Sequence, residues 1–393
     1  MFGSFIEVDY SQKFKNKHLV AGDTFLSRKL KEEERTIAVL SDGLGSGIKA
    51  NVLSTLTATM ALNYVNNNFD LHKAAKIIMQ TLPVCKVRKI SYSTFSIVDI
   101  NKLGEVTIME YDNPPYVIIR DGEVLETEKE IIQWTNKNNY QNTLRFSKFT
   151  AQKNDRIIMF SDGVTQSGLG PKTYPFGWQQ KNVEEFISAM ICKFPEISAR
   201  MLAKSIVDRA YINDRKSAYD DITCSVINIR EPRKLVVMTG PPIDKRKDRS
   251  LAETIDAFDG KKIICGGTTA KIISRELGRE ITVNLKDLNP EVPTTSNMPG
   301  IDLITEGSIT LGKVVELLQN DKRNDKLPAN GATRMLNFLL DSDIIEFVVG
   351  TKINDAHQDP NVPVELEIRR NIIKQICELL EKKYLKETKL SFI

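Results

Sequence analysis

Hydrophobic and polar positions in the first half of the chain predict a strand followed by two helices. Residues 36–41 (TIAVLS) form an apolar run that is typical of a buried strand. The apolar side chains that then recur at helical spacing are Ile48, Val52, Leu53, Leu56, Met60, Tyr64 and Val65. They predict a helix that packs through this face. Residues 71–82 (LHKAAKIIMQTL) predict a second helix.

Short β-rich runs dominate the rest of this half. They are residues 92–100, 105–111, 115–125, 156–161 and 222–229. Turn signals at residues 101–104 (NKLG), 113–115 (NPP) and 121–122 (DG) separate the first of them, as antiparallel hairpins require. Two further helices are predicted near residues 183–194 and 197–211. We therefore expect an α+β domain in which two sheets pack face to face between helices, a four-layer α-β-β-α sandwich.

The pattern of predicted strands and helices changes at residues 230–234 (REPRK), where we place a domain boundary. Strand and helix patterns alternate from there on. They are residues 235–239, 250–258, 261–265, 268–277, 281–285, 344–350 and 364–384. Such alternation is typical of a smaller α/β domain with a largely parallel sheet. The predicted domains are therefore residues 1–230 and 234–393.

Composition excludes several classes of protein. The 393 residues are 41% hydrophobic and 27% charged, as in globular proteins, and no apolar segment approaches the length of a membrane span. The first residues lack the pattern of a signal peptide, so we expect a cytoplasmic protein. The net charge of +4 is small and spread along the chain, which argues against nucleic acid as a partner. The basic run at residues 245–249 (KRKDR) is interpreted as a solvated loop.

Cysteines and histidines are too scattered to form a zinc site. The five cysteines contain no CxxC pair, so we expect them to be reduced and mostly buried. The three histidines are far apart in the sequence as well. Any catalytic metal must therefore depend on carboxylates.

The stretch SDGLGSG, residues 41–47, follows the first predicted strand, and SDG returns at residues 161–163 after another apolar run. The glycine spacing matches neither GxGxxG, because residue 48 is Ile, nor the nucleoside triphosphate loop, because the GK[ST] ending is missing. What remains is Asp42 followed by Gly43, which lets the backbone carbonyl approach a ligand closely. Carboxylate and carbonyl oxygens select Mg²⁺ or Mn²⁺.

One aspartate is too few for such a site, and three further candidates lie beside apolar runs. These are Asp23 in AGDTF, Asp162 in the second SDG, and the pair Asp220 and Asp221 before the last strand of the domain. We expect their carboxylates to converge on a shared cation, which would offset their repulsion. Each SDG alone also fits an ordinary turn with an aspartate helix cap. Four aspartate sites in this order along the chain favour a metal site over ordinary turns.

Together these motifs resemble the metal-dependent type 2C protein phosphatases in their SpoIIE-like bacterial branch. The resemblance covers about residues 4–230 and rests on GD at 22–23, SDGLGSGIKA, NPPYVIIRDGE, FSDGVTQSG, FGW and YDDITCSVINI. It implies a sandwich that holds two Mn²⁺ or Mg²⁺ ions at one end. It also implies a signalling hydrolase that removes phosphate from phosphoserine or phosphothreonine of a protein by means of an activated water.

Site residues follow from the resemblance position by position. Asp42 would bridge both ions, and the Gly43 carbonyl would bind one of them. Asp162 and Asp220 would hold the other ion, with Asp221 either replacing or orienting Asp220. Asp23 would take the place of the acidic residue near the family's N-terminal strand. Asp42 and Asp162 are the expected catalytic residues.

The second half resembles no family that we recognise. Residues 265–271 (CGGTTAK) follow a predicted strand and open a predicted helix. Gly266, Gly267, Thr268, Thr269 and Lys271 therefore predict a site for a small anionic ligand at a helix N-terminus, although a tight turn with a helix cap explains them equally. Two alternative functions stay open for the whole chain. One is a non-catalytic scaffold whose second domain binds a ligand or partner, and the other is a phosphatase of small phosphate esters.

Overall fold

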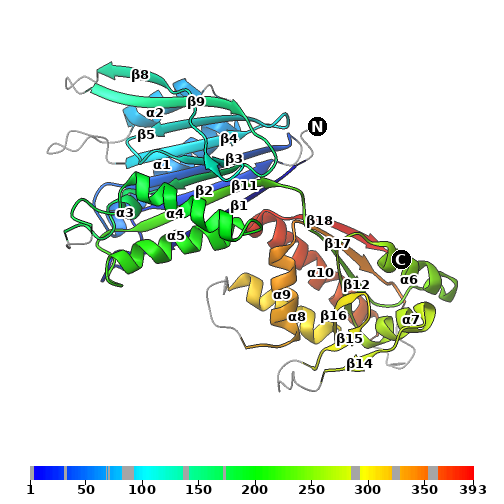
Figure 1. Cartoon of the computed structure of the whole chain (residues 1–393). Helices are drawn as coiled ribbons and strands as arrows, with labels where there is room; N and C mark the ends of the chain where they lie inside the picture. The colour runs from blue at the N-terminus through cyan, green and yellow to red at the C-terminus, as the bar shows by residue number, and fades with distance from the viewer. Residues whose placement is uncertain are drawn as a thin grey trace. The chain divides into compact units, whose positions relative to one another are not determined.

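The computed structural model describes residues 4–30, 33–67, 69, 71–81, 93–135, 141–170, 174–284, 293–320, 328–352 and 362–393. The chain divides into two compact units, residues 1–231 and 232–393 (Figure 1). None of the described helices combines the length and the apolar character that crossing a membrane requires.

Unit 1 contains two antiparallel sheets. The five-stranded sheet has the order β1-β11-β10-β6-β7, and the six-stranded sheet has the order β2-β3-β4-β5-β9-β8. The strands of the first are β1 (Phe5–Lys13), β11 (Ile222–Arg230), β10 (Arg156–Phe160), β6 (Val117–Arg120) and β7 (Glu123–Val124). Those of the second are β2 (Thr24–Leu30), β3 (Arg35–Gly43), β4 (Ser93–Ile100), β5 (Glu105–Tyr111), β9 (Gln141–Thr150) and β8 (Glu130–Thr135).

Successive side chains of a strand point to opposite faces of its sheet and so contribute to two separate hydrophobic cores. On β3, Ala38 and Leu40 face the other sheet and meet Ile157 and Ile227 in the layer between the sheets. Their neighbours Ile37 and Val39 point the opposite way. There they pack beneath α1 (Ile48–Asn66) and α2 (Leu71–Thr81).

The outer face of the five-stranded sheet is covered in the same way. Its apolar side chains pack against helices α3 (Asp162–Thr165), α4 (Gln180–Lys193) and α5 (Ala199–Asn213) (Figure 1). The four-layer α-β-β-α arrangement predicted from the sequence is confirmed.

The predicted helix after SDGLGSG exists, but its buried face differs from the prediction. Ile48, Val52 and Leu56 are 73%, 60% and 46% exposed. Of the predicted face, Val65 is buried, and Met60 and Tyr64 are partly buried against the core. The other residues through which the helix packs are mostly small: Ala50, Ser54, Thr57, Ala58, Ala61 and Leu62. Small side chains let α1 lie very close to the end of β3, whereas the larger apolar face would hold it away from the sheet.

Unit 2 is built on a seven-stranded sheet with the order β14-β15-β16-β13-β12-β17-β18. The strands are β12 (Lys234–Thr239), β13 (Lys261–Cys265), β14 (Thr282–Val283), β15 (Ser296–Met298), β16 (Ile301–Thr305), β17 (Ile344–Val349) and β18 (Glu387–Phe392). The pairings from β16 through β18 are all parallel. The antiparallel pairings lie at one edge, between β14 and β15 and between β15 and β16. The predicted largely parallel sheet is therefore confirmed.

Helices cover both faces of this sheet. Helices α6 (Asp248–Ala257) and α7 (Gly267–Leu277) pack on one face around Val236, Met238 and Ile264. Helices α8 (Ser308–Gln319), α9 (Gly331–Asp341) and α10 (Val362–Tyr384) pack on the other face around Leu235 and Val237. The predicted strand at 281–285 is reduced to the two residues of β14 at the antiparallel edge.

The described cysteines are free thiols, but they are less uniformly buried than predicted. Cys224 and Cys265 are buried, Cys377 is partly buried and Cys192 is exposed. Cys85 lies outside the described residues.

Candidate metal centre

The strand registers bring the predicted aspartates to one edge of the sandwich. Asp42 is the penultimate residue of β3, and Asp23 directly precedes β2, whose Thr24 pairs with Ser41. On the other sheet, Asp162 follows β10, and Asp221 precedes β11. Because β10 and β11 are antiparallel, with Phe160 opposite Cys224, the end of one lies beside the start of the other.

The carboxyl groups of Asp23 and Asp42 lie close enough to each other for a hydrogen bond, which forms only when one of them carries a proton. Asp23 is only 4% exposed. Burial, and then the negative charge of Asp221, raise the pKa of Asp23 to about 7, although hydrogen bonds from Thr223 and Ser161 oppose the rise. The Thr223 hydroxyl donates to Asp23 Oδ2 at 2.6 Å.

The carboxylate of Asp42 is affected by the charges of three other aspartates. Its pKa is raised well above the ordinary value, first by burial and then by the negative charges of Asp23, Asp162 and Asp220. These four aspartates therefore lie within electrostatic reach of one another. Their shared negative charge is a cost that a bound cation would remove.

Asp162 and Asp220 engage nearby donors. The Gln166 side chain donates to Asp162 Oδ2 at 2.9 Å, one turn along α3. The ammonium of Lys15 lies 3.5 Å from Asp220 Oδ1. The side chain of Asp220 is 44% exposed, so its carboxylate is accessible from solvent.

Asp221 has a different role in this structure. It is 3% exposed, and both of its oxygens accept hydrogen bonds from backbone amides, from Lys15 at 2.9 Å and from Gly22 at 2.8 Å. The carboxylate thus ties the segment between β1 and β2 to the start of β11. This anchoring places Asp23, which follows Gly22, opposite Asp42.

The glycines of both SDG turns permit close backbone contacts. A Cβ on Gly43 would lie 2.2 Å from the carbonyl oxygen of Ala50 in the first turn of α1. A Cβ on Gly163 would lie 2.1 Å from the carbonyl oxygen of Asp221. The Gly43 carbonyl oxygen lies close to Gly22. A Cβ placed on Gly22 would be 3.6 Å from this oxygen. Any larger residue would push the two walls of the cluster apart.

The cluster suits a hard divalent cation by its chemistry, but not in its present side-chain arrangement. Within the described ranges, no group of three or more His, Cys, Asp and Glu side chains is arranged to hold a metal ion as it stands. Instead, Asp162 accepts a hydrogen bond from Gln166, Asp220 pairs with Lys15, and the raised pKa of Asp42 favours its protonated form. All the candidate ligand atoms are oxygens, as Mg²⁺ and Mn²⁺ require. Binding would need the side chains to turn toward the ion and release the proton.

Sequence reasoning missed three residues of this edge. Thr223 and Ser161 hydrogen bond to Asp23, and Lys15 faces Asp220. Thr223 is the last residue of the DDIT motif and Ser161 is the first residue of the second SDG, so the motifs themselves were an available signal. Lys15 carries no such signal, because only the fold brings it to Asp220.

A sandwich of two antiparallel sheets between helices, with aspartates gathered at one edge, defines the class of PP2C-type phosphatase domains. The family model of stage II sporulation protein E (SpoIIE) matches residues 32–230, about half of the chain. The chain belongs to the SpoIIE family.

Several solved structures are similar to unit 1. The SpoIIE phosphatase domain from Bacillus subtilis is 18% identical, with a TM-score of 0.43, over 58% of this chain and 94% of that chain. The SiaA-PP2C domain of Pseudomonas aeruginosa is 13% identical, with a TM-score of 0.42, over 56% and 85%. RsbX in complex with magnesium is 16% identical, with a TM-score of 0.37, over 57% and 95%. No curated protein matches the chain.

Proposed function

We propose that the chain is a metal-dependent protein phosphatase that hydrolyses phosphoserine and phosphothreonine. The observation that carries this proposal is the convergence of Asp23, Asp42, Asp162 and Asp220 at one edge, where burial and then the negative charges of the other three raise the pKa of Asp42. Membership of the SpoIIE family supports the same activity. The magnesium in the RsbX complex is consistent with the choice of ion.

The proposed ligands come from both sheets. Asp42 would bridge two ions and the Gly43 carbonyl would bind one of them. Asp162 and Asp220 would hold the other ion, and Asp23 would complete the set. When bound, two Mn²⁺ or Mg²⁺ ions would neutralise the phosphate, polarise its oxygens and activate a water for in-line attack on phosphorus.

The chain's own residues prepare this edge. Asp221 fixes the backbone of Lys15 and Gly22 through its two oxygens, and Thr223 orients the carboxyl group of Asp23. We therefore assign Asp221 as a positioning residue and Asp220, whose carboxylate is solvent accessible, as the direct ligand. Lys15 would lose its contact with Asp220 when an ion binds there.

The test is Mn²⁺-dependent hydrolysis of a phosphoserine peptide and of p-nitrophenyl phosphate. Asp42→Asn and Asp162→Asn should each abolish turnover. Asp208→Asn, an exposed aspartate paired with lysines on the outer surface, is the matched control and should retain it. A wild-type protein without metal-dependent turnover of any phosphate ester would overturn the enzyme assignment. Turnover of small esters alone would instead identify a small-molecule phosphatase.

One observation favours a scaffold as the second candidate. The described carboxylates, as they stand, leave no group of three arranged for an ion. A scaffold would bind neither Mn²⁺ nor Mg²⁺ in a calorimetric titration, whereas the phosphatase should bind both with an affinity that rises with pH, because ligand protons are released.

A further inference from the structure

The order of the parallel strands in unit 2 creates a topological switch point. From β16 to β18 the spatial order is β16-β13-β12-β17-β18, so the chain leaves β12 in one direction and later returns to its other side at β17. The helices that follow these two strands, α6 and α10, cover opposite faces of the sheet. In open α/β sheets, ligands bind outside the carboxyl ends of the strands at such a point.

A positively charged side chain lies at this point. Arg369 of α10 packs on Gly240, directly after β12, with Nη1 2.5 Å from the position that a Cβ there would take. Gly240 has a φ of 81°, a conformation that also favours glycine. The Nε of Arg369 is buried and has no hydrogen-bond partner among the described residues. The Cys265 thiol at the end of β13 lies within electrostatic reach of this guanidinium.

Buried hydroxyl groups without partners lie near the same strand ends. Thr239 ends β12, Thr269 is in the first turn of α7, and Thr310 is in the first turn of α8. Each is at most 1% exposed, and no described residue hydrogen bonds to its hydroxyl. An unsatisfied buried hydroxyl costs about 1–3 kcal/mol, a cost that a ligand would remove.

The two helices that carry Thr269 and Thr310 begin side by side. Gly266 and Gly307 are their N-terminal caps, and a Cβ on Gly307 would lie 3.9 Å from the Cα of Gly266. The Thr269 hydroxyl points toward the start of its helix, 3.7 Å from the Cβ position of Gly266. Adjacent helix N-termini direct free backbone amides to one place and favour phosphate.

An acidic side chain restricts the chemical class of the ligand that this edge can bind. Glu306 follows β16, and its Oε1 lies 3.5 Å from the Cβ position of Gly267 at the start of α7. A carboxylate there repels a bare anion but accepts hydrogen bonds from hydroxyl groups. The exposed Lys271 adds nothing at the helix start, so the anion site expected at residues 266–271 is only part of the arrangement.

We propose that the carboxyl edge of this sheet binds a small phosphate ester with free hydroxyl groups, either a nucleotide or a sugar phosphate. The phosphate lies toward Arg369 and the end of β12, and the hydroxyls lie toward Glu306 beside the two helix starts.

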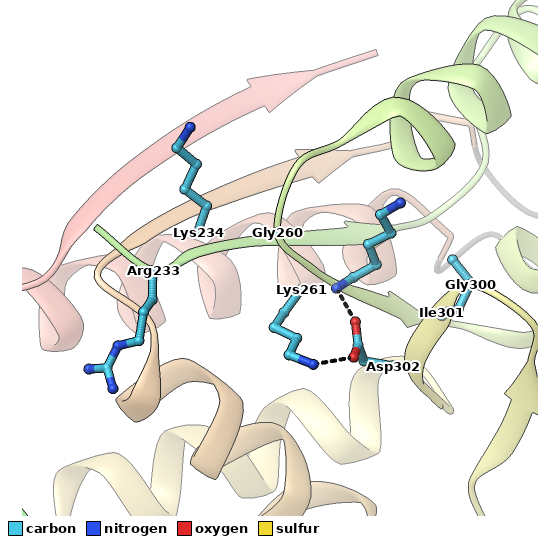
Figure 2. A pocket seen from close by; sticks show the side chains of 8 residues that line it. Arg233, Lys234, Gly260, Lys261, Gly300, Ile301 and Asp302 are labelled. Atoms are coloured by element: carbon cyan, nitrogen blue, oxygen red, sulfur yellow. Dashed lines mark hydrogen bonds and ion pairs between the residues drawn. The ribbon is translucent and has the colours of Figure 1, made fainter. Parts of the chain in front are cut away.

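The opposite edge of the sheet offers a competing basic pocket. This pocket of about 550 Å³ is lined by Arg233, Lys234, Lys261, Lys262 and Asp302, with Gly260, Gly300 and Ile301 (Figure 2). Two of its four cationic side chains already have acidic partners, since Lys261 Nζ lies 2.8 Å from Asp302 and Arg233 pairs with Asp343. It also lies at the amino ends of the strands. We use it as the internal control for anion binding.

The test is calorimetry on the full chain with EDTA, which keeps the acidic edge of unit 1 free of metal. The probes are AMP, ribose 5-phosphate, ribose, inorganic phosphate and glycine. AMP or ribose 5-phosphate should bind more tightly than phosphate or ribose, and comparing the two distinguishes nucleotide from sugar phosphate. Asp42→Asn should leave this binding unchanged.

Single substitutions test whether the phosphate ester binds at the switch point. Arg369→Gln should weaken phosphate ester binding by about tenfold or more, because a charge-assisted hydrogen bond is lost. Its neighbour Arg370, which stacks on Phe392, and Lys261 of the competing pocket provide the controls R370Q and K261Q, which should bind normally. Glu306→Gln should reduce the preference for ribose 5-phosphate over phosphate. Thr239→Val tests the site independently if the Arg369 variant misfolds, and it should also weaken binding.

Three results with phosphate esters would overturn the proposal. They are no binding of any phosphate ester, equal binding by wild type and both the Arg369 and Thr239 variants, and loss of binding only in K261Q. Tighter binding of glycine than of ribose 5-phosphate would show that the pair Arg369 and Glu306 holds a zwitterion, which contradicts the proposed ligand class.

Discussion

Replacing Asp23 by asparagine should stabilise unit 1 in the absence of metal. The ordinary pKa of an aspartate is 3.8, and that of the buried Asp23 is about 7. Between these values the unfolded chain has lost its proton while the folded protein keeps it. The stability of the metal-free protein should therefore fall as pH rises from about 4 to about 7 and level off above. Asp42, whose pKa is also raised, acts in the same direction.

The magnitude follows from this difference in pKa. About three pKa units at 1.36 kcal/mol each give about 4 kcal/mol at pH 8, and little of this cost is present at pH 4. Asparagine carries no charge and still accepts the hydrogen bond from Thr223. Asp23→Asn should therefore be nearly neutral at pH 4 and add up to about 4 kcal/mol at pH 8.

Urea unfolding followed by tryptophan fluorescence provides the assay. The chain has two tryptophans, Trp134 and Trp178, and both belong to unit 1, so the signal reports this unit alone. With EDTA, the variant should gain stability as pH rises. With saturating Mn²⁺ the order should reverse, because only the wild type retains the full ligand set. A wild-type stability that does not fall between pH 4 and 7, or a variant without any gain at pH 8, would refute the reasoning.

Three further substitutions probe the close contacts. Gly43→Ala should cost about 1–3 kcal/mol in urea unfolding, because the new methyl group overlaps the Ala50 carbonyl oxygen; wild-type stability would contradict the contact. Asp221→Asn should cost about 1.5–3 kcal/mol and weaken Mn²⁺ binding in calorimetry, because its amide cannot accept both backbone hydrogen bonds; unchanged affinity would argue against a positioning role. Asp343→Asn should destabilise unit 2 by about 3–5 kcal/mol, since Lys386 would lose its buried partner; hydrogen exchange of β12 and β17 measures this, and unaltered protection would contradict it.

The sequence predicted the strand ends of the candidate site well. An apolar run that stops at Asp-Gly marks where a buried strand reaches the surface, and this local signal located Asp42 and Asp162. The resemblance to a phosphatase family placed both at one edge, which the strand registers bear out. The metal roles of these residues stay predictions until an ion is measured.

What the sequence could not supply depends on contacts between distant residues. Asp221 bonds to the Gly22 amide 199 residues away, so its anchoring role has no local pattern. The buried face of α1 was misjudged because apolar spacing alone does not reveal that Ala50 must fit against Gly43. In unit 2, β16 was missed because Asp302 interrupts its apolar run, and Arg369 meets Gly240 only through the fold.

The most direct test of the account is a Mn²⁺ titration of the full chain followed by electron paramagnetic resonance. Free Mn²⁺ has a strong signal that diminishes on binding, so the signal counts bound ions without relying on turnover. The account predicts two bound ions per chain, with magnetic coupling between them, and loss of the coupled pair in Asp42→Asn. The matched Asp208→Asn variant should behave like the wild type. Absence of bound Mn²⁺, or a coupled pair that persists in Asp42→Asn, would contradict the assignment of this edge as a dinuclear metal centre.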